Sequence, residues 1–195
     1  MIVRLALAGC FFAVMCSSAL GESSYTYVGV SYDTTDFLEE DFSGYSFDIS
    51  VGIDDNIFVF AEYKKLESDD AFSDFSFSSE KLEVSERFVG IGFHTPVSNS
   101  FDFVGSLSVI DSTVEFMGNK FSGDGNVIRA GFKGMASEKI ELSVLANRSD
   151  VENFIETGNS SSVKYFFTPA IAAVLEYDKV DSLDVRSLGI QINLN

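Results

Sequence analysis

Residues 45–63 read YSFDISVGIDDNIFVFAEY, with apolar residues at every second position on both sides of a short polar centre. Side chains of a strand point to opposite faces in turn, so this alternation indicates two strands with one apolar face each. The centre, Asp54-Asp55-Asn56, consists of residues that favour tight turns. The stretch therefore predicts a β-hairpin.

The same period of two continues along the chain. Further strand candidates are residues 26–32, 89–93, 101–109, 128–132, 140–146, 163–167, 171–177 and 188–194. With the two strands of the hairpin they make ten. We find no convincing 3.6-residue period after residue 21, so the sequence predicts an all-β fold.

Composition limits the classes of function. The chain has 195 residues, which fits one domain, and a formal net charge of −17. Its 20 Phe and 7 Tyr argue against disorder. An acidic chain lacks the bases that neutralise phosphates, so we expect no nucleic-acid partner. The chain has one His and two Cys, and the two Cys lie near the amino terminus. Residues for acid-base, thiol or zinc chemistry are therefore scarce. We expect no enzyme and no cofactor.

Residues 1–21 have the pattern of a cleaved secretory signal. Arg4 precedes an apolar run at residues 5–15, and the small residues Ala19 and Gly21 stand at the expected cleavage site. That run is too short to span a bilayer as a helix. Cys10 and Cys16 lie in the removed segment. We therefore predict an exported domain at residues 22–195 without a disulfide.

The connections between the predicted strands alternate in length. Short turns are expected at residues 54–56, 95–100, 137–139 and 168–170, and longer polar loops at 33–41, 67–80, 115–124, 150–162 and 179–182. Small residues and scattered charges oppose the apolar face of each strand. An apolar outer face, a polar lumen and short turns at one end are typical of a transmembrane β-barrel.

We therefore predict an up-and-down antiparallel transmembrane β-barrel of ten strands. Eight strands are the alternative if residues 163–177 form one long strand, but Pro169 argues against it because proline is rarely accepted inside a paired strand. A soluble sandwich and a lipocalin-like soluble barrel are the other architectures that such strands could form.

Two motifs resemble outer-membrane proteins. The carboxy-terminal SLGIQINLN (residues 187–195) resembles the signal read by the barrel assembly machinery, with Gly189, Ile192 and Leu194 at the matching positions. It differs in ending on Asn195 and in lacking aromatic residues. The motif YFFTP (residues 165–169), repeated in form by GIGFHTP (residues 90–96), is similar to the last turn of porin-family outer-membrane β-barrel proteins.

This resemblance implies insertion into a bacterial outer membrane, with membrane lipid, lipopolysaccharide and the assembly machinery as partners. The enzymes among such barrels need a His near the outer end. The one His here, His94, lies at a predicted periplasmic turn, where Asp102 can hydrogen-bond to it. We therefore predict no catalytic residue and no metal ligand.

Ten ionisable residues fall on the inward face of the predicted strands: Asp48, Glu62, Lys64, Glu86, Asp102, Arg129, Lys133, Glu141, Lys164 and Glu176. Unpaired charge is costly in a narrow lumen, so six acids near four bases predict a paired network that fills the barrel. The alternative is a cation-preferring channel lined by the acidic excess.

Ten further acids fall in the first two predicted outer loops: Asp33, Asp36, Glu39, Glu40, Asp41, Glu67, Asp69, Asp70, Asp74 and Glu80. One interpretation is a solvated surface of like charge. The other is binding of divalent cations that bridge to lipopolysaccharide phosphates. Phe72, Phe75 and Phe77 in the second loop are candidates for an adhesive or lipid-contacting tip.

Taken together, the sequence predicts a non-enzymatic integral outer-membrane protein that is structural or interacts with surfaces through its acidic loops. A small passive channel for ions or solutes is the first alternative. A soluble periplasmic ligand-binding barrel is the second.

Overall fold

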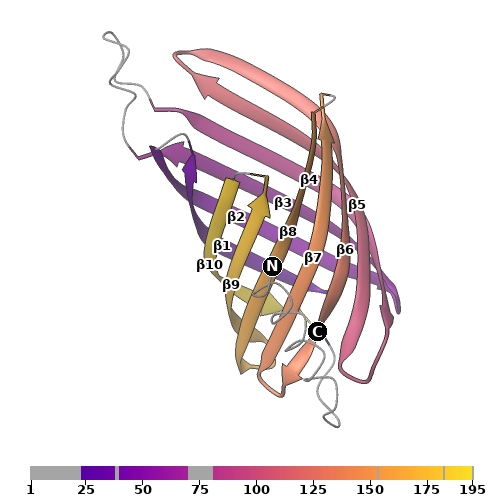
Figure 1. Ribbon diagram of the computed structural model, residues 1–195. Helices are drawn as coiled ribbons and strands as arrows, with labels where there is room; N and C mark the ends of the chain where they lie inside the picture. The colour runs from indigo at the N-terminus through magenta and orange to yellow at the C-terminus, as the bar shows by residue number, and fades with distance from the viewer. Residues whose placement is uncertain (1–22, 38–39, 70–80, 153, 182, 195) are drawn as a thin grey trace, which may run out of the picture.

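The computed structural model describes residues 23–37, 40–69, 81–152, 154–181 and 183–194, and these form a closed antiparallel β-barrel (Figure 1). Its ten strands are β1 (Tyr27–Phe37), β2 (Glu40–Asp54), β3 (Ile57–Ser68), β4 (Glu83–Pro96), β5 (Phe101–Phe116), β6 (Asn119–Ser137), β7 (Ile140–Val151), β8 (Phe154–Thr168), β9 (Ile171–Val180) and β10 (Leu183–Asn193). Each strand pairs with its neighbours in sequence, and β1 pairs with β10. The predicted all-β barrel is confirmed.

Ten strands, rather than eight, make the wall. Strand β8 ends at Thr168 and β9 begins at Ile171, so Pro169 lies in the turn between them. The barrel closes where Tyr27 of β1 lies opposite Asn193 of β10. The start of the first strand and the finish of the last strand therefore lie at the same end of the barrel, as expected for an even number of strands.

The predicted outer loops at residues 33–41, 115–124 and 150–162 are wrong, because the strands continue through most of them, whereas most of 67–80 lies outside the described residues. Residues 115–124 form the ends of β5 and β6 around a turn at Met117 and Gly118. The described residues of 150–162 belong to β7 and β8 apart from Glu152, which lies in a turn. Positive φ angles of 52° at Met117, 71° at Gly118 and 50° at Glu152 give the backbone twist that tight hairpin turns need. These hairpins therefore project as paired strands.

The outward face of the barrel is apolar. Val89 and Leu188 are 61% and 64% exposed in the absence of lipid. Near the turns at residues 97–100 and 138–139, Phe103 packs against both Phe93 and Phe132, with ring centroids 6.0 and 5.7 Å apart. Towards the other end, the rings of Tyr32 and Tyr45 lie 5.5 Å apart. Aromatic girdles that flank an apolar band are typical of membrane barrels.

The inward face is mixed rather than uniformly polar. One apolar cluster of Tyr25, Phe58 and Val104 lies near the short turns, and another of Phe88, Ile110 and Val127 lies further along the interior. Serines and charged residues occupy the space between them. Within the described ranges, no helix is long and apolar enough to cross a membrane.

Candidate functional site

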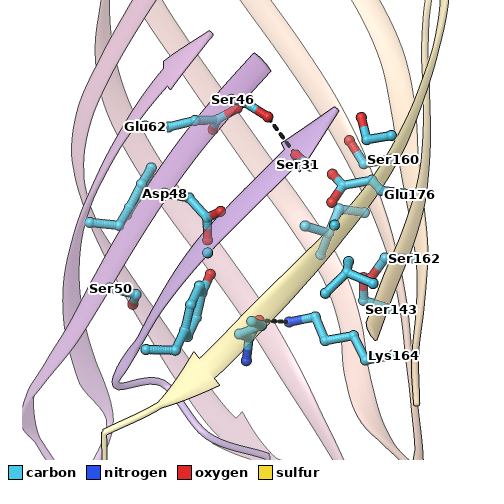
Figure 2. Close-up of a pocket in the computed structure, with 18 of the residues that line it drawn as sticks. Ser31, Ser46, Asp48, Ser50, Glu62, Ser143, Ser160, Ser162, Lys164 and Glu176 are labelled. Carbon is cyan, nitrogen blue, oxygen red and sulfur yellow. Dashed lines mark hydrogen bonds between the residues drawn. The ribbon is translucent and has the colours of Figure 1, made fainter. Parts of the chain in front are cut away.

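The lumen holds a cavity of about 200 Å³ that is lined by both polar and apolar side chains (Figure 2). Eight serines contribute to its wall: Ser31, Ser46, Ser50, Ser106, Ser143, Ser160, Ser162 and Ser187. Two serine pairs bridge neighbouring strands, with hydroxyl oxygens 2.6 Å apart for Ser31 and Ser46 and 2.8 Å apart for Ser143 and Ser162. These small side chains leave room along the axis of the barrel, and their hydroxyl groups both donate and accept hydrogen bonds.

Seven of the ten ionisable residues predicted to face inward line this cavity: Asp48, Glu62, Lys64, Arg129, Lys133, Lys164 and Glu176. Two of the others, Asp102 and Glu141, lie at the end of the cavity near the short turns, and Glu86 stands opposite Lys64 in the register of β3 and β4. The prediction missed Asp178, which also lines the cavity. The alternation of Val174, Glu176 and Asp178 along β9 carries the signal that would have revealed it.

Two ion pairs cross the interior between strands that are not neighbours. Arg129 of β6 lies 3.2 Å from the Glu62 carboxylate of β3, and its guanidinium sits 5.2 Å from the centre of the Phe88 ring. Lys64 of β3 lies 3.9 Å from Asp178 of β9. These contacts join opposite walls and narrow the lumen.

Glu141 lies at the end of the cavity near the short turns. It is 2% exposed and lies 3.2 Å from Lys164 and 3.8 Å from Lys133. Each lysine also has a second partner, since Lys164 donates to the Gln191 side chain at 2.7 Å and Lys133 donates to the carbonyl of Ser24 at 2.8 Å. One carboxylate thus holds two buried ammonium groups.

The segment before β1 closes this end of the lumen. The ring of Tyr25 stacks on His94 with centroids 3.7 Å apart, and its hydroxyl donates to Asp102 at 2.8 Å. Lys133 lies 4.2 Å from the centre of the same ring. Ser50 donates to the Tyr25 carbonyl at 2.7 Å and fixes the backbone of the segment. We call this arrangement of Tyr25, His94, Asp102, Lys133 and Glu141 the periplasmic closure, after the side of the membrane that the sequence predicts for this end.

His94 therefore lies where the sequence places it, next to Asp102. Its Nδ1 is 3.1 Å from the Asp102 carboxylate. The ring is stacked under Tyr25 inside the periplasmic closure, which is a packing role. No group of three or more His, Cys, Asp or Glu side chains in the described residues is placed to hold a metal ion directly.

The predicted acidic loops need correction. Asp33 lies on the inward face of β1 and is 0% exposed, because the alternation of Gly29 and Ser31 continues through it. The other described members, Asp36, Glu40, Asp41, Glu67 and Asp69, lie in or directly after strands β1 to β3. Lys65, which lies just before the second predicted loop, is 3.2 Å from Glu67. Glu39, Asp70, Asp74, Glu80, Phe72, Phe75 and Phe77 lie outside the described residues.

The residues of the predicted assembly signal are all in or next to β10. Ile192 and Leu194 point outward and are exposed, whereas Gly189 lines the cavity. A side chain at Gly189 would meet the Val30 carbonyl and Ser31 of β1. The glycine therefore permits the close pairing of β10 with β1 that closes the barrel.

No protein-family model and no curated protein matches the chain. Solved structures do match. The NanC porin is 10% identical, over 86% of this chain and 100% of that chain, with a TM-score of 0.56. OprG from Pseudomonas aeruginosa is 12% identical, over 90% and 98%, with a TM-score of 0.45. Ail of Yersinia pestis is 11% identical, over 90% and 98%, with a TM-score of 0.36.

At these identities the likeness concerns the fold alone. A closed ten-stranded barrel with an apolar outer band defines the class: this chain is an outer-membrane β-barrel protein in fold. The resemblance inferred from the sequence is thereby confirmed.

Proposed function

We propose that this chain is a non-enzymatic barrel of the bacterial outer membrane, exported by a cleaved signal peptide, that acts at the cell surface through its projecting hairpins and does not conduct. The observation that carries this proposal is the periplasmic closure. Stacked rings, an ion-paired carboxylate and a backbone segment fill the lumen at one end, and barrels of about eight strands are just filled by side chains.

The projecting hairpins supply a surface for contact. Phe121 near the tip of β5 and β6, and Phe154 at the tip of β7 and β8, are 66% and 75% exposed. Lipopolysaccharide is the partner we propose for the outer rim. Arg87, Arg148 and Arg186 point outward just beyond the apolar band, and guanidinium groups suit phosphate recognition. Bridging by divalent cations at exposed acids such as Asp36 and Asp41 belongs to the same proposal.

A small passive channel is the second candidate, favoured by the cavity of about 200 Å³ and the charged residues that line it. Such a channel needs an opening past the periplasmic closure. A soluble ligand-binding barrel is disfavoured, because its apolar faces would point inward, whereas the outward face here is apolar.

Planar-bilayer recordings test the proposal. We expect no stepwise conductance from the purified wild-type protein. In Tyr25→Ala the stacked pair with His94 is lost, and such a pair contributes about 1 kcal/mol beyond its burial. A change of that size raises the ratio of open to closed lumens about fivefold. We therefore expect more frequent steps in Tyr25→Ala than in the wild type.

Tyr32→Ala is the matched control, because Tyr32 points outward from β1 and is exposed. Like the wild type, Tyr32→Ala should show no stepwise conductance. Regular conductance steps from the wild-type protein would contradict the proposal and favour the channel.

A further inference from the structure

We propose that an apolar groove on the outward face of β1 to β4 binds an acyl chain of lipid A, the membrane anchor of lipopolysaccharide, and that Arg87 binds a phosphate of the same molecule. The inference rests on the proposed function, which places the barrel in the outer membrane with lipopolysaccharide as a partner. It goes further by assigning that partner a site on one side of the barrel.

The groove lies over four strands that are neighbours in the barrel wall (Figure 1). It has a volume of about 560 Å³. Six outward-facing apolar or aromatic residues line it: Val28, Phe47, Ile49, Ala61, Tyr63 and Val89. The polar residues of the lining alternate with these along the strands and direct their side chains into the lumen, apart from Arg87. The groove is therefore apolar along its length.

Ala61 forms the floor of the groove. Its cross-strand neighbours are Ile49 of β2 and Val89 of β4, which are larger and exposed. A small residue between two larger ones leaves a hollow in the outward face. Tyr63 is the next outward residue of β3 and lies further from the short turns. The hollow therefore follows β3 within the apolar band, where an acyl chain gains contact with apolar side chains.

Arg87 stands opposite Tyr63, at the end of the groove further from the short turns. Its guanidinium carbon is 6.0 Å from the centre of the Tyr63 ring. Its Nη1 is 3.9 Å from the carboxylate of Asp111, which is too far for a hydrogen bond. The guanidinium makes no hydrogen bond to another residue in the described ranges. Its donors therefore remain available, and their planar arrangement matches a phosphate.

The order of these features along the barrel assigns the ligand. A cation above an apolar groove complements a lipid with an anionic headgroup, and Arg87 is on the side of the outer leaflet, where lipopolysaccharide lies. Lys65, the next outward residue of β3, is already held by Glu83 and Glu67 at 2.8 and 3.2 Å. On the outward face of β3 and β4, phosphate recognition therefore falls to Arg87.

Native mass spectrometry of the full-length protein, released from nonionic detergent with added lipid A, tests this inference by counting bound lipids. We expect the wild type to bind one lipid A more tightly than any further molecules. Arg87→Gln should weaken this tight binding about tenfold or more, the loss expected for one charge-assisted contact. Ala61→Phe fills the floor and should weaken it about fivefold, which corresponds to roughly 40 Å² of apolar contact.

Asp111→Asn should change the affinity in the opposite direction. The Asp111 carboxylate competes with a phosphate for Arg87, and an exposed ion pair of this kind contributes little. Its removal should tighten lipid A binding by up to about fivefold. A purely structural role of Arg87 would not produce this gain.

Two variants outside the groove are the matched controls. Lys120→Gln removes one positive charge from the outward face of β6, and Ala146→Phe adds the same ring to the outward face of β7. Both should leave the tight binding unchanged. Ala61→Leu replaces Ala61→Phe if the larger residue prevents folding, which heat-modifiable migration on gels reveals.

Four results would overturn the inference. They are no tight binding by the wild type, equal weakening in Arg87→Gln and Lys120→Gln, equal effects of Ala61→Phe and Ala146→Phe, and binding of phosphatidylglycerol or of dephosphorylated lipid A as tight as that of lipid A. None of them bears on the conductance recordings, so the lipid A site and the proposed function fail independently.

Discussion

Replacing Glu141 with alanine is expected to destabilise the barrel by about 3–5 kcal/mol, because it leaves two buried ammonium groups without their shared carboxylate. Lys164 and Lys133 lie 3.2 and 3.8 Å from Glu141, and Glu141 itself is almost fully buried. Loss of the carboxylate also removes the centre of the periplasmic closure. Urea titration of folded protein in lipid vesicles, followed by circular dichroism, measures the change in free energy of unfolding.

The control for this prediction is Glu138→Ala. Glu138 lies in the exposed turn between β6 and β7, three residues from Glu141. Exposed charges contribute about 0–1 kcal/mol, so little change is expected. If Glu141→Ala has the same free energy of unfolding as Glu138→Ala, the prediction is wrong, and Glu141 does not stabilise the barrel through its contacts with the two lysines.

Ala130→Arg is expected to destabilise the barrel by about 2–4 kcal/mol, the cost of a lipid-facing arginine near the bilayer midplane. Ala130 points outward from β6, opposite Gly105 of β5 and Ala146 of β7. Both of these neighbours are small, although the Phe93 ring lies over Gly105. The same urea titration in vesicles measures it.

Asn126→Arg is the matched variant on the same face of β6. Asn126 is exposed, lies four residues further from the short turns than Ala130 and stands opposite Asp150 of β7. An arginine there remains in water near an opposite charge, so we expect at most about 1 kcal/mol of change. Equal losses in both variants would show that residue 130 does not face lipid.

The period of two was sufficient to predict the barrel, because every strand separates lipid from lumen. The same pattern placed the ten inward ionisable residues, seven of which line the cavity. It failed where polar composition was taken as evidence of a loop. Asp33 and Asp178 continue the alternation of β1 and β9, and polar residues near Gly118 continue β5 and β6, because a strand above the membrane needs no apolar face.

The sequence predicted the contact of His94 with Asp102, but the part of Tyr25 in the periplasmic closure was beyond what the sequence can predict. Tyr25 precedes the first strand, and its partners come from distant strands: His94 from β4, Asp102 from β5 and Lys133 from β6. These residues meet only because the register of the closed barrel brings them to one end. Contacts of this kind depend on the whole ring of strands rather than on any local pattern.

Fluorescence of single tryptophans tests the central claim, that the apolar face of each strand meets lipid. The chain contains no Trp, so each variant reports one position. Leu107 points outward from β5, and Phe60 packs inside the barrel. In bilayers whose acyl chains carry bromine, we predict strong quenching of Leu107→Trp and little quenching of Phe60→Trp. Equal quenching of the two, or quenching of neither, would contradict the account.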